Sequence, residues 1–145
     1  MKRLSIFLLT GLLLMPLTSC TVEQGLQTVA DHANSLSTSD SKKVKLVREG
    51  YLADFSGSIT VGQALNSFLG NPIWQYFMAD SGERVVQCNG TCTYNNKQVE
   101  AKIQFIVDED EGTFEVGALA FNDLEQNLLT TQMFLSKAYE SAVAE

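Results

Sequence analysis

The sequence predicts an α+β fold: a short N-terminal tether helix, then a helix, a four-stranded antiparallel meander and a C-terminal helix, in two layers. Three patterns support this prediction. Apolar residues recur at helical spacing from Val61 to Leu69 and again after Leu128. Between them, from Ile73 to Asn122, apolar and polar residues mostly alternate, as in strands with one buried face.

The composition is that of a globular protein with an acidic surface. The chain has 145 residues, of which 45% are hydrophobic and 19% charged, which excludes wholesale disorder. Seventeen acidic residues against 10 basic ones give a net charge of −7. Binding to nucleic acid and charge-driven docking onto anionic lipid are therefore disfavoured.

Residues 1–19 are predicted to be a lipoprotein signal peptide. Lys2 and Arg3 precede an apolar run from Leu4 to Met15, which is shorter than the roughly 20 residues that span a bilayer. Leu17-Thr18-Ser19-Cys20 follows and resembles the lipobox of bacterial lipoproteins, in which the cysteine is lipidated and the signal is cut just before it. The alternatives are an ordinary secretory signal that contains Cys20, or an uncleaved anchor.

The lipobox resemblance implies a location. Acyl chains on Cys20 attach a protein stably to a membrane without a transmembrane helix. Thr21, in place of Asp, implies the outer membrane with the domain on its periplasmic face, or the outer face of the cell membrane in a one-membrane bacterium. Loss of Lys2 and Arg3 with the signal would leave 17 acidic against 8 basic residues, a formal charge of −9.

Residues 20–43 are predicted to hold the lipidated cysteine, a tether helix and a serine-rich linker from Ser35 to Lys43. Apolar residues at spacings of four, three, four and three give one helical stripe: Val22, Leu26, Val29, Ala33 and Leu36. Two heptads are too short for a stable coiled coil. The stripe therefore predicts a helix lying against the domain or the membrane, or a small oligomerising stub.

The globular domain is predicted to span residues 44–145, beginning with a short strand or extended segment at Val44 and Leu46. Thr60 and Gln63 fit a capping box at the start of the first helix. Gly70, followed by Asn71-Pro72, ends that helix. Its buried face is formed by Val61, Ala64, Leu65, Phe68 and Leu69.

The central hairpin has a register that the sequence specifies. If Asn95-Asn96 is a two-residue turn, an apolar row faces one side, with the pairs Cys92–Val99, Cys88–Ile103 and Val86–Phe105. The alternate pairs are polar. A slip of one residue would destroy this separation, so the register is well determined.

The remaining strands and the last helix follow from turns and periodicity. The first strand runs from Ile73 to Ala79, and the fourth from Thr113 to Asn122 with a bulge at Gly117. The segments Asp80 to Glu83 and Asp108 to Gly112 are turns. Asn122 or Asp123 is expected to cap the final helix, whose apolar stripe is Leu128, Leu135, Ala138, Tyr139 and Ala142.

The domain is poor in residues that carry catalysis. The only histidine, His32, lies in the tether, so the commonest general base and metal ligand is missing between residues 44 and 145. No glycine-rich phosphate loop and no C-x-x-C pair occurs. We therefore predict no enzymatic activity, no cofactor and no metal; a hydrolase using only Asp54 with Asp80 or Glu83 is the remaining enzymatic hypothesis.

The acidic run from Asp108 to Gly112 superficially resembles a calcium loop. It lacks the distal bidentate glutamate of such loops and falls where a hairpin turn is needed. A solvated turn is the favoured interpretation, and weak calcium binding is the alternative.

Cys88 and Cys92 allow two interpretations. In an oxidising compartment two cysteines four residues apart fit a local disulfide across the loop Asn89-Gly90-Thr91. In the hairpin register above they instead lie on one face of a single strand, roughly 13 Å apart, as buried free thiols.

Aromatic residues supply the candidate binding surface. Tyr51, Phe55 and Trp74 are expected to be exposed and to contact a partner. The strand aromatics form either core or a groove for lipid or peptide: Trp74, Tyr76, Phe77, Phe105 and Phe114.

Two further resemblances concern the domain. The stretch V-x-L-V-R-E-G-Y-L-A-D-F…I-T-V-G-Q-A-L-N-S-F-L-G-N-P-I-W from Val44 to Trp74, with G-T-C-T-Y-N-N-K and A-K-I-Q-F-I-V, resembles a group of small uncharacterised bacterial exported domains. More weakly, Thr60, Gln63, Leu69, Gly70 and Pro72 resemble the T-x-x-Q-V…L-G-x-P helix of the SmpA/OmlA lipoproteins of the β-barrel assembly machine. The distance from Thr60 to Gly70 is one residue longer than in that group.

Two functions remain open at this point. The first is a membrane-anchored, non-enzymatic binding or assembly module of the cell envelope, whose partners are the membrane, through Cys20, and another envelope protein. The second is an inhibitor or sensor that captures a soluble periplasmic or extracellular protein, which the acidic charge would suit if that protein is basic.

Overall fold

The computed structural model describes residues 42–145. The predicted signal peptide, the lipobox cysteine Cys20 and the tether helix lie outside the described residues. The described elements are α2 (Lys42–Arg48), α3 (Val61–Phe68), β1 (Gly70–Met78), β2 (Arg84–Tyr94), β3 (Lys97–Asp108), β4 (Thr113–Phe121), β5 (Leu124–Glu125) and α4 (Leu128–Val143).

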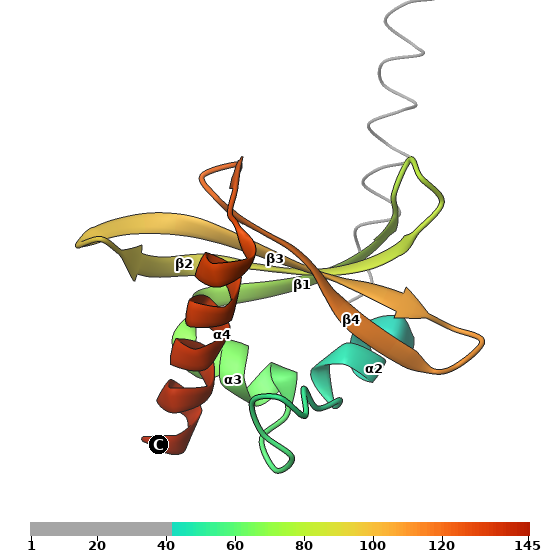
Figure 1. The fold of residues 1–145 in the computed structure, drawn as a ribbon, viewed down its shortest axis with the longest axis horizontal. Coiled ribbons are helices and arrows are strands. Elements are labelled where there is room, and N and C mark those ends of the chain that lie inside the picture. Colours follow the sequence, from blue (N-terminus) through green and yellow to red (C-terminus); the bar gives the residue numbers. More distant parts are fainter. Residues whose placement is uncertain (1–41) are drawn as a thin grey trace, which may run out of the picture. The chain divides into compact units, whose positions relative to one another are not determined.

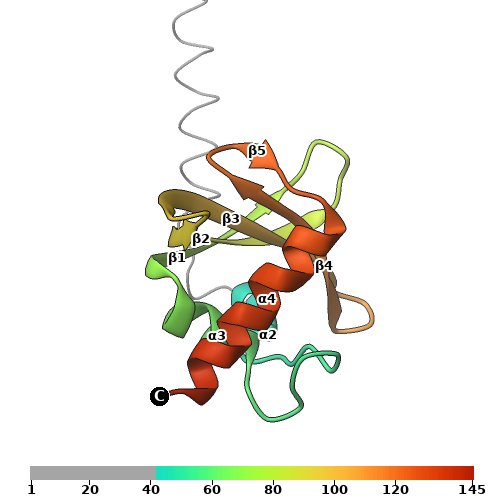
Figure 2. The same ribbon diagram turned by 60° about the vertical axis from the view of Figure 1, so that its left-hand side comes forward.

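The strands form one antiparallel sheet in the order β1-β2-β3-β4-β5. Figures 1 and 2 show a strongly twisted sheet with the three helices on one of its faces. The α+β fold is confirmed, but the sheet has five strands in the described part of the chain, where four were expected. Its core lies between the helices and the sheet, where the largest fully buried side chains are Phe105, Leu65, Ile103 and Leu119.

The predicted register of the central hairpin is confirmed. Cys92 pairs with Val99, Cys88 with Ile103 and Val86 with Phe105. Asn95 and Asn96 have φ angles of 49° and 59°, the left-handed pair that a tight two-residue hairpin turn requires. Asparagine tolerates this conformation better than most residues, so the turn fixes the pairing of both strands.

The bulge at Gly117 is also confirmed. Gln104 pairs with Ala118 and Phe105 with Val116, which leaves Gly117 without a partner on β3. A Cβ at Gly117 would lie 3.1 Å from Cγ1 of Ile106, closer than an ordinary contact. Glycine therefore allows Ile106 to lie across the bulge.

The predicted capping box begins α3. The Thr60 hydroxyl accepts a hydrogen bond from the Gln63 amide at 3.1 Å, and the Gln63 side chain accepts one from the Thr60 amide at 2.9 Å. The helix buries Val61, Ala64 and Leu65. It ends at Phe68, and β1 begins at Gly70, three residues before the predicted start.

The first element of the domain was predicted wrongly. Val44 and Leu46 suggested an extended segment, but residues 42–48 form the helix α2. Its buried residues are Val44 and Val47, a spacing of three that places both on one helical face. Burial of this pair against the sheet and α3 decides the conformation.

The predicted cap of the last helix was also wrong. Asn122 and Asp123, with φ angles of 48° and 66°, form the turn between β4 and β5. Asn127 caps α4, because its side chain accepts a hydrogen bond from the Thr130 amide at 2.9 Å. Leu128, expected in the core, is 73% exposed; the buried residues of α4 are Thr131, Phe134, Leu135, Ala138 and Tyr139.

The packing of α3 leads to a stability prediction. Leu65→Ala should lower the free energy of unfolding by about 2–5 kcal/mol, because it leaves a cavity at a fully buried position. Gln63→Ala, which removes one half of an exposed capping box, should cost less than about 1 kcal/mol. Urea titrations of both variants of residues 21–145 measure the difference, and equal losses would contradict this account of the helix.

Candidate functional site

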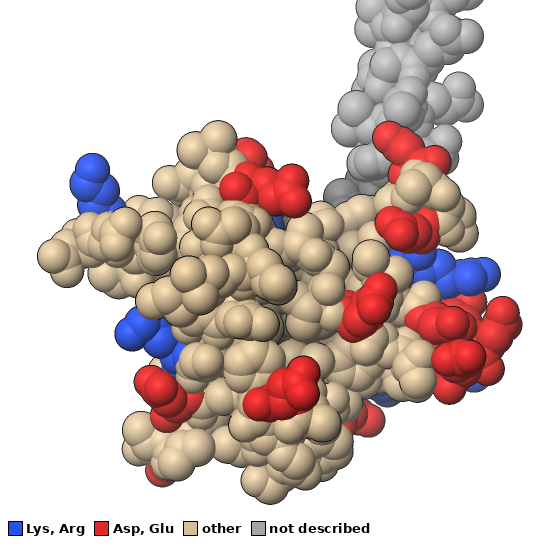
Figure 3. Space-filling model, in the orientation of Figure 1, with Lys and Arg blue, Asp and Glu red and all other residues tan. Residues whose placement is uncertain are grey.

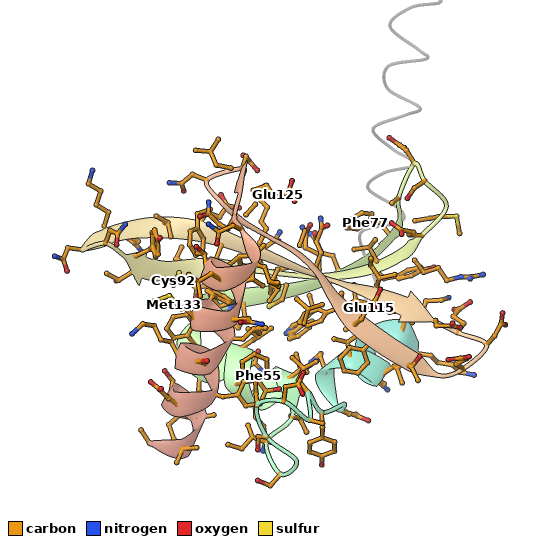
Figure 4. The ribbon with its side chains drawn as sticks, viewed as in Figure 1. Phe55, Phe77, Cys92, Glu115, Glu125 and Met133 are labelled. Carbon is orange, nitrogen blue, oxygen red and sulfur yellow. The ribbon has the colours of Figure 1, made fainter. Side chains whose placement is uncertain are left out.

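An open groove among three segments is the candidate site. It lies between the loop of residues 51–55, strand β4 and the first half of α4, and has a volume of about 410 Å³. Figure 4 labels two residues that line the groove, Phe55 of the loop and Glu115 of β4. The groove is lined mainly by apolar side chains, among them Tyr51, Phe55, Phe114, Val116, Leu128 and Leu135.

The 51–55 loop is held in place by stacking and by its own hydrogen bonds. The rings of Phe55 and Tyr139 stack with centroids 5.4 Å apart and an interplanar angle of 13°. The backbone carbonyl of Leu52 accepts hydrogen bonds from the amides of Phe55 and Ser56 at 2.9 and 3.0 Å. One wall of the groove is therefore fixed to α4 through an aromatic pair.

Tyr139 provides this support from within the core. Burial raises the pKa of its phenol, which the Leu52 backbone amide opposes only in part. The hydroxyl is buried and makes no hydrogen bond of good geometry with the described residues. Tyr139 therefore stays neutral and acts as a packing residue beneath Phe55.

A group of exposed apolar side chains lies beside the groove. Leu124 of β5 is 70% exposed, and Leu128, Leu129 and Met133 of α4 are 73%, 66% and 55% exposed. We call these four residues the β5–α4 patch. Leu128 lines the groove, and Leu129 and Met133 line a neighbouring depression on α4 that shares Gln132 with it. Single exposed leucines are ordinary, but several exposed apolar side chains around one groove are typical of a contact surface.

The surroundings of the groove are acidic. Among residues 42–145, Asp54 and Glu115 are the only charged side chains that line it. A second depression, of about 550 Å³, shares Phe114 and Glu115 with it and is lined by further acids: Glu83, Asp108, Asp110 and Glu111. Figure 3 shows acidic side chains spaced over this face and gathered densely at the β3–β4 turn.

The basic side chain nearest these acids is already paired. Arg84 lines the second depression, and its Nε lies 2.8 Å from Oε2 of Glu109. Lys43 of α2 binds the other oxygen of Glu109 at 2.6 Å. The acids that line the two depressions therefore face solvent without a salt bridge in the described part of the chain.

The acidic turn is built as a hairpin turn. The Asp108 carboxylate accepts hydrogen bonds from the amides of Asp110 and Glu111 at 3.0 and 3.1 Å. Gly112 has a φ of 65°, which closes the turn. Within residues 42–145 no group of three His, Cys, Asp or Glu side chains is arranged to hold a metal ion.

Two of the three predicted surface aromatics line the groove. Tyr51 is 52% exposed and Phe55 is half-buried. Trp74 was predicted wrongly, since it is buried opposite Cys88 on the helix-facing side of the sheet. Its Nε1 donates to Oδ1 of Asn66 at 3.3 Å, and the Arg48 guanidinium lies 5.8 Å from its ring.

Cys88 and Cys92 are free thiols on β2, both buried, so the structure does not contain the alternative disulfide. Burial raises the pKa of Cys88 to about 12, although the charge of Arg48 opposes this. Burial also raises the pKa of Cys92. A nucleophilic cysteine needs the opposite shift, so neither thiol is a candidate nucleophile.

The carboxylates of the enzymatic hypothesis do not share one site. Asp54 lines the groove and Glu83 lines the second depression. Asp80, in the β1–β2 turn, lines neither of them. All three side chains are exposed.

Of the strand aromatics expected in the core or in a groove, Phe114 of β4 lines the groove, but the sequence did not identify the start of α4 as part of the site. One signal was available: Leu128-Leu129 followed by Met133 gives more apolar residues than one helical face can bury. Comparisons with protein-family models, curated proteins and solved structures found no match to this chain. Among residues 42–145 no helix is long and apolar enough to cross a membrane.

The buried thiol of Cys88 leads to a prediction about pH. Above about pH 9 the thiol ionises in the unfolded chain but stays protonated in the folded one, because burial raises its pKa to about 12. As the pH rises from about 9 towards 12, ionisation of the Cys88 thiol therefore favours the unfolded state progressively more, and the free energy of unfolding falls. Up to pH 11, the free energy of unfolding should fall more steeply than in Cys88→Ala, by up to about 1.4 kcal/mol per pH unit.

Urea titrations of residues 21–145 under reducing conditions, from about pH 8 to pH 11, measure both slopes. Equal slopes for the two proteins would show that Cys88 ionises as readily in the folded state as in the unfolded one.

Proposed function

We propose that this protein is a membrane-anchored lipoprotein that acts as a non-enzymatic binding or assembly module of the bacterial cell envelope. The observation that carries this proposal is the apolar groove of about 410 Å³ with the β5–α4 patch beside it. A groove of this size, flanked by exposed leucines and an acidic rim, is suited to a protein segment.

The anchor is proposed from the sequence. Leu17-Thr18-Ser19-Cys20 behind a basic start and an apolar run supports lipidation of Cys20, and Thr21 supports the periplasmic face of the outer membrane. A lipid on Cys20 would attach the domain through the segment of residues 20–41. The protein would then meet its partner at the membrane surface.

The non-enzymatic character is supported by the side chains at the groove. Its charged groups are two carboxylates, and its other polar side chains include Thr131 and Gln132. The buried cysteines have raised pKa values and lie on the sheet. We therefore assign to the groove recognition without chemical conversion.

A second function is favoured by the acidic rim. Asp54, Glu115 and the acids of the second depression would attract a basic partner, and such a partner need not be membrane-bound. The protein would then be an inhibitor or sensor that captures a soluble basic protein. The two functions differ in where the captured protein is found.

Lipidation of Cys20 is directly testable. In cells that express Cys20→Ala, labelling with a clickable palmitate analogue should disappear, and a precursor or a soluble form should replace the membrane-bound protein. The matched control is Ser19→Ala, which keeps a small residue before the cysteine and should still be labelled. Acylation of the Cys20→Ala protein, with retention in the membrane fraction, would contradict the anchor.

Occupation of the groove can be tested by photocrosslinking in cells. A benzophenone amino acid in place of Leu128, which lines the groove and belongs to the β5–α4 patch, should give a discrete adduct of higher mass on irradiation. The same amino acid at Gln98, an exposed site on β3, should give none. The captured protein is then identified from the adduct and located in unirradiated cells. A partner found in the membrane fraction supports the assembly module, and a partner found in the soluble fraction supports the inhibitor or sensor. Identical diffuse products at both sites would contradict a specific binding surface.

A further inference from the structure

The groove includes a strand edge that is free to pair. In residues 42–145, β5 pairs with β4 only at Ala120 and Phe121. The outer edge of β4 from Thr113 to Val116 therefore has no neighbouring strand, and no loop backbone group of the described residues bonds to it. Four residues of strand extend about 13 Å, enough to pair with a short extended segment.

The side chains of this edge alternate between two environments. Phe114 and Val116 pair with Val107 and Phe105 on the core-facing rows of β3, and both line the groove. Glu115, between them, pairs with Ile106 on the open face of the sheet and is exposed. A strand added beside β4 would therefore direct alternate side chains into the groove and towards Glu115.

The charges around the β4 edge are mainly negative. The groove and the second depression are lined by carboxylates, and Arg84, which lines the second depression, is paired with Glu109. Lys43, which lies 4.6 Å from the ring centre of Tyr76 on β1, is paired with the same carboxylate. A positively charged segment would therefore be attracted to the β4 edge.

We propose that the β4 edge accepts an extended segment of a partner protein in which large apolar side chains alternate with lysine or arginine. The segment adds to the sheet as a strand, its backbone pairing with residues 113–116. Its apolar side chains enter the groove against Phe114, Val116 and Leu128, and its basic side chains lie beside Glu115 and the acids of the β3–β4 turn. This inference rests on the proposed function and specifies the partner's binding segment.

The test uses the full-length lipidated protein in nanodiscs of neutral phosphatidylcholine. The probes are fluorescein-labelled eight-residue peptides in which lysine or arginine alternates with valine, leucine, isoleucine, phenylalanine or tyrosine. Fluorescence anisotropy should detect saturable binding of at least one of them, and its analogue with glutamate at the basic positions should not bind. Empty nanodiscs give the background.

Three changes examine the geometry. Glu115→Lys should weaken binding by about tenfold or more, whereas Glu140→Lys, the same charge change on an exposed site of α4, should alter it by less than about twofold. Leu128→Ser should also weaken binding. Methylating the peptide amides that face β4 should abolish binding, while methylating the alternate amides should leave it intact.

Hydrogen–deuterium exchange locates the bound segment. Peptide binding should slow exchange in the fragment that contains Thr113 to Val116 and leave β1 unchanged. Protection of β1 instead, or binding that is insensitive to both methylation patterns, would overturn strand addition. Failure of the whole panel to bind would overturn it as well.

Other occupants of the groove give distinct results, each of which overturns the proposal. Peptide binding by a Leu26→Asp, Val29→Asp variant, with none by the unaltered protein, would assign the groove to the protein's own tether segment. Concentration-dependent dimers that Leu128→Ser dissolves would assign it to a second copy. Equal peptide binding to nanodiscs with and without the protein would show that the peptides bind the lipid and not the groove. If strand addition fails while the crosslink from residue 128 persists, the proposed binding module stands without this mode of binding. If the crosslink is absent as well, both the proposed function and strand addition are overturned.

Discussion

The structure depends on the pairing of β2 with β3. Because Asn95-Asn96 fixes the hairpin, every second residue of both strands enters the core, including Cys88 opposite Ile103 and Val86 opposite Phe105. The three helices cover this one face, and each buries residues against it. A slip of one residue would expose the apolar row and bury glutamines, so no other register leaves the helices a surface to pack on.

The groove results from how the sheet ends. After the turn at Asn122-Asp123, β5 is only two residues long, so it covers the end of β4 and leaves the rest of that edge without a strand partner among the described residues. After β5 the chain begins α4 at the Asn127 cap. This start places Leu128 in the groove, beside Phe114 and Val116 of β4. The loop below, held by the Phe55–Tyr139 stack, closes the other side.

Sequence reasoning identified the elements whose signals are local. The capping box, the central hairpin and the bulge at Gly117 each follow from a few adjacent residues or from strict alternation. It failed where tertiary contacts decide: α2 has two buried valines in seven residues, too few to distinguish helix from strand. The groove combines segments near residues 51, 115 and 128, and no pattern within one segment shows that they meet.

A free strand edge is ordinarily a site of self-association, and proteins protect such edges with charge and bulges. Here Glu115 and the bulge at Gly117 serve that purpose on β4. Two copies that paired through this edge would bring Glu115 and the acidic turns of both together, which like-charge repulsion opposes. The same charges favour a basic segment, so one arrangement of side chains disfavours self-pairing and selects the partner's charge.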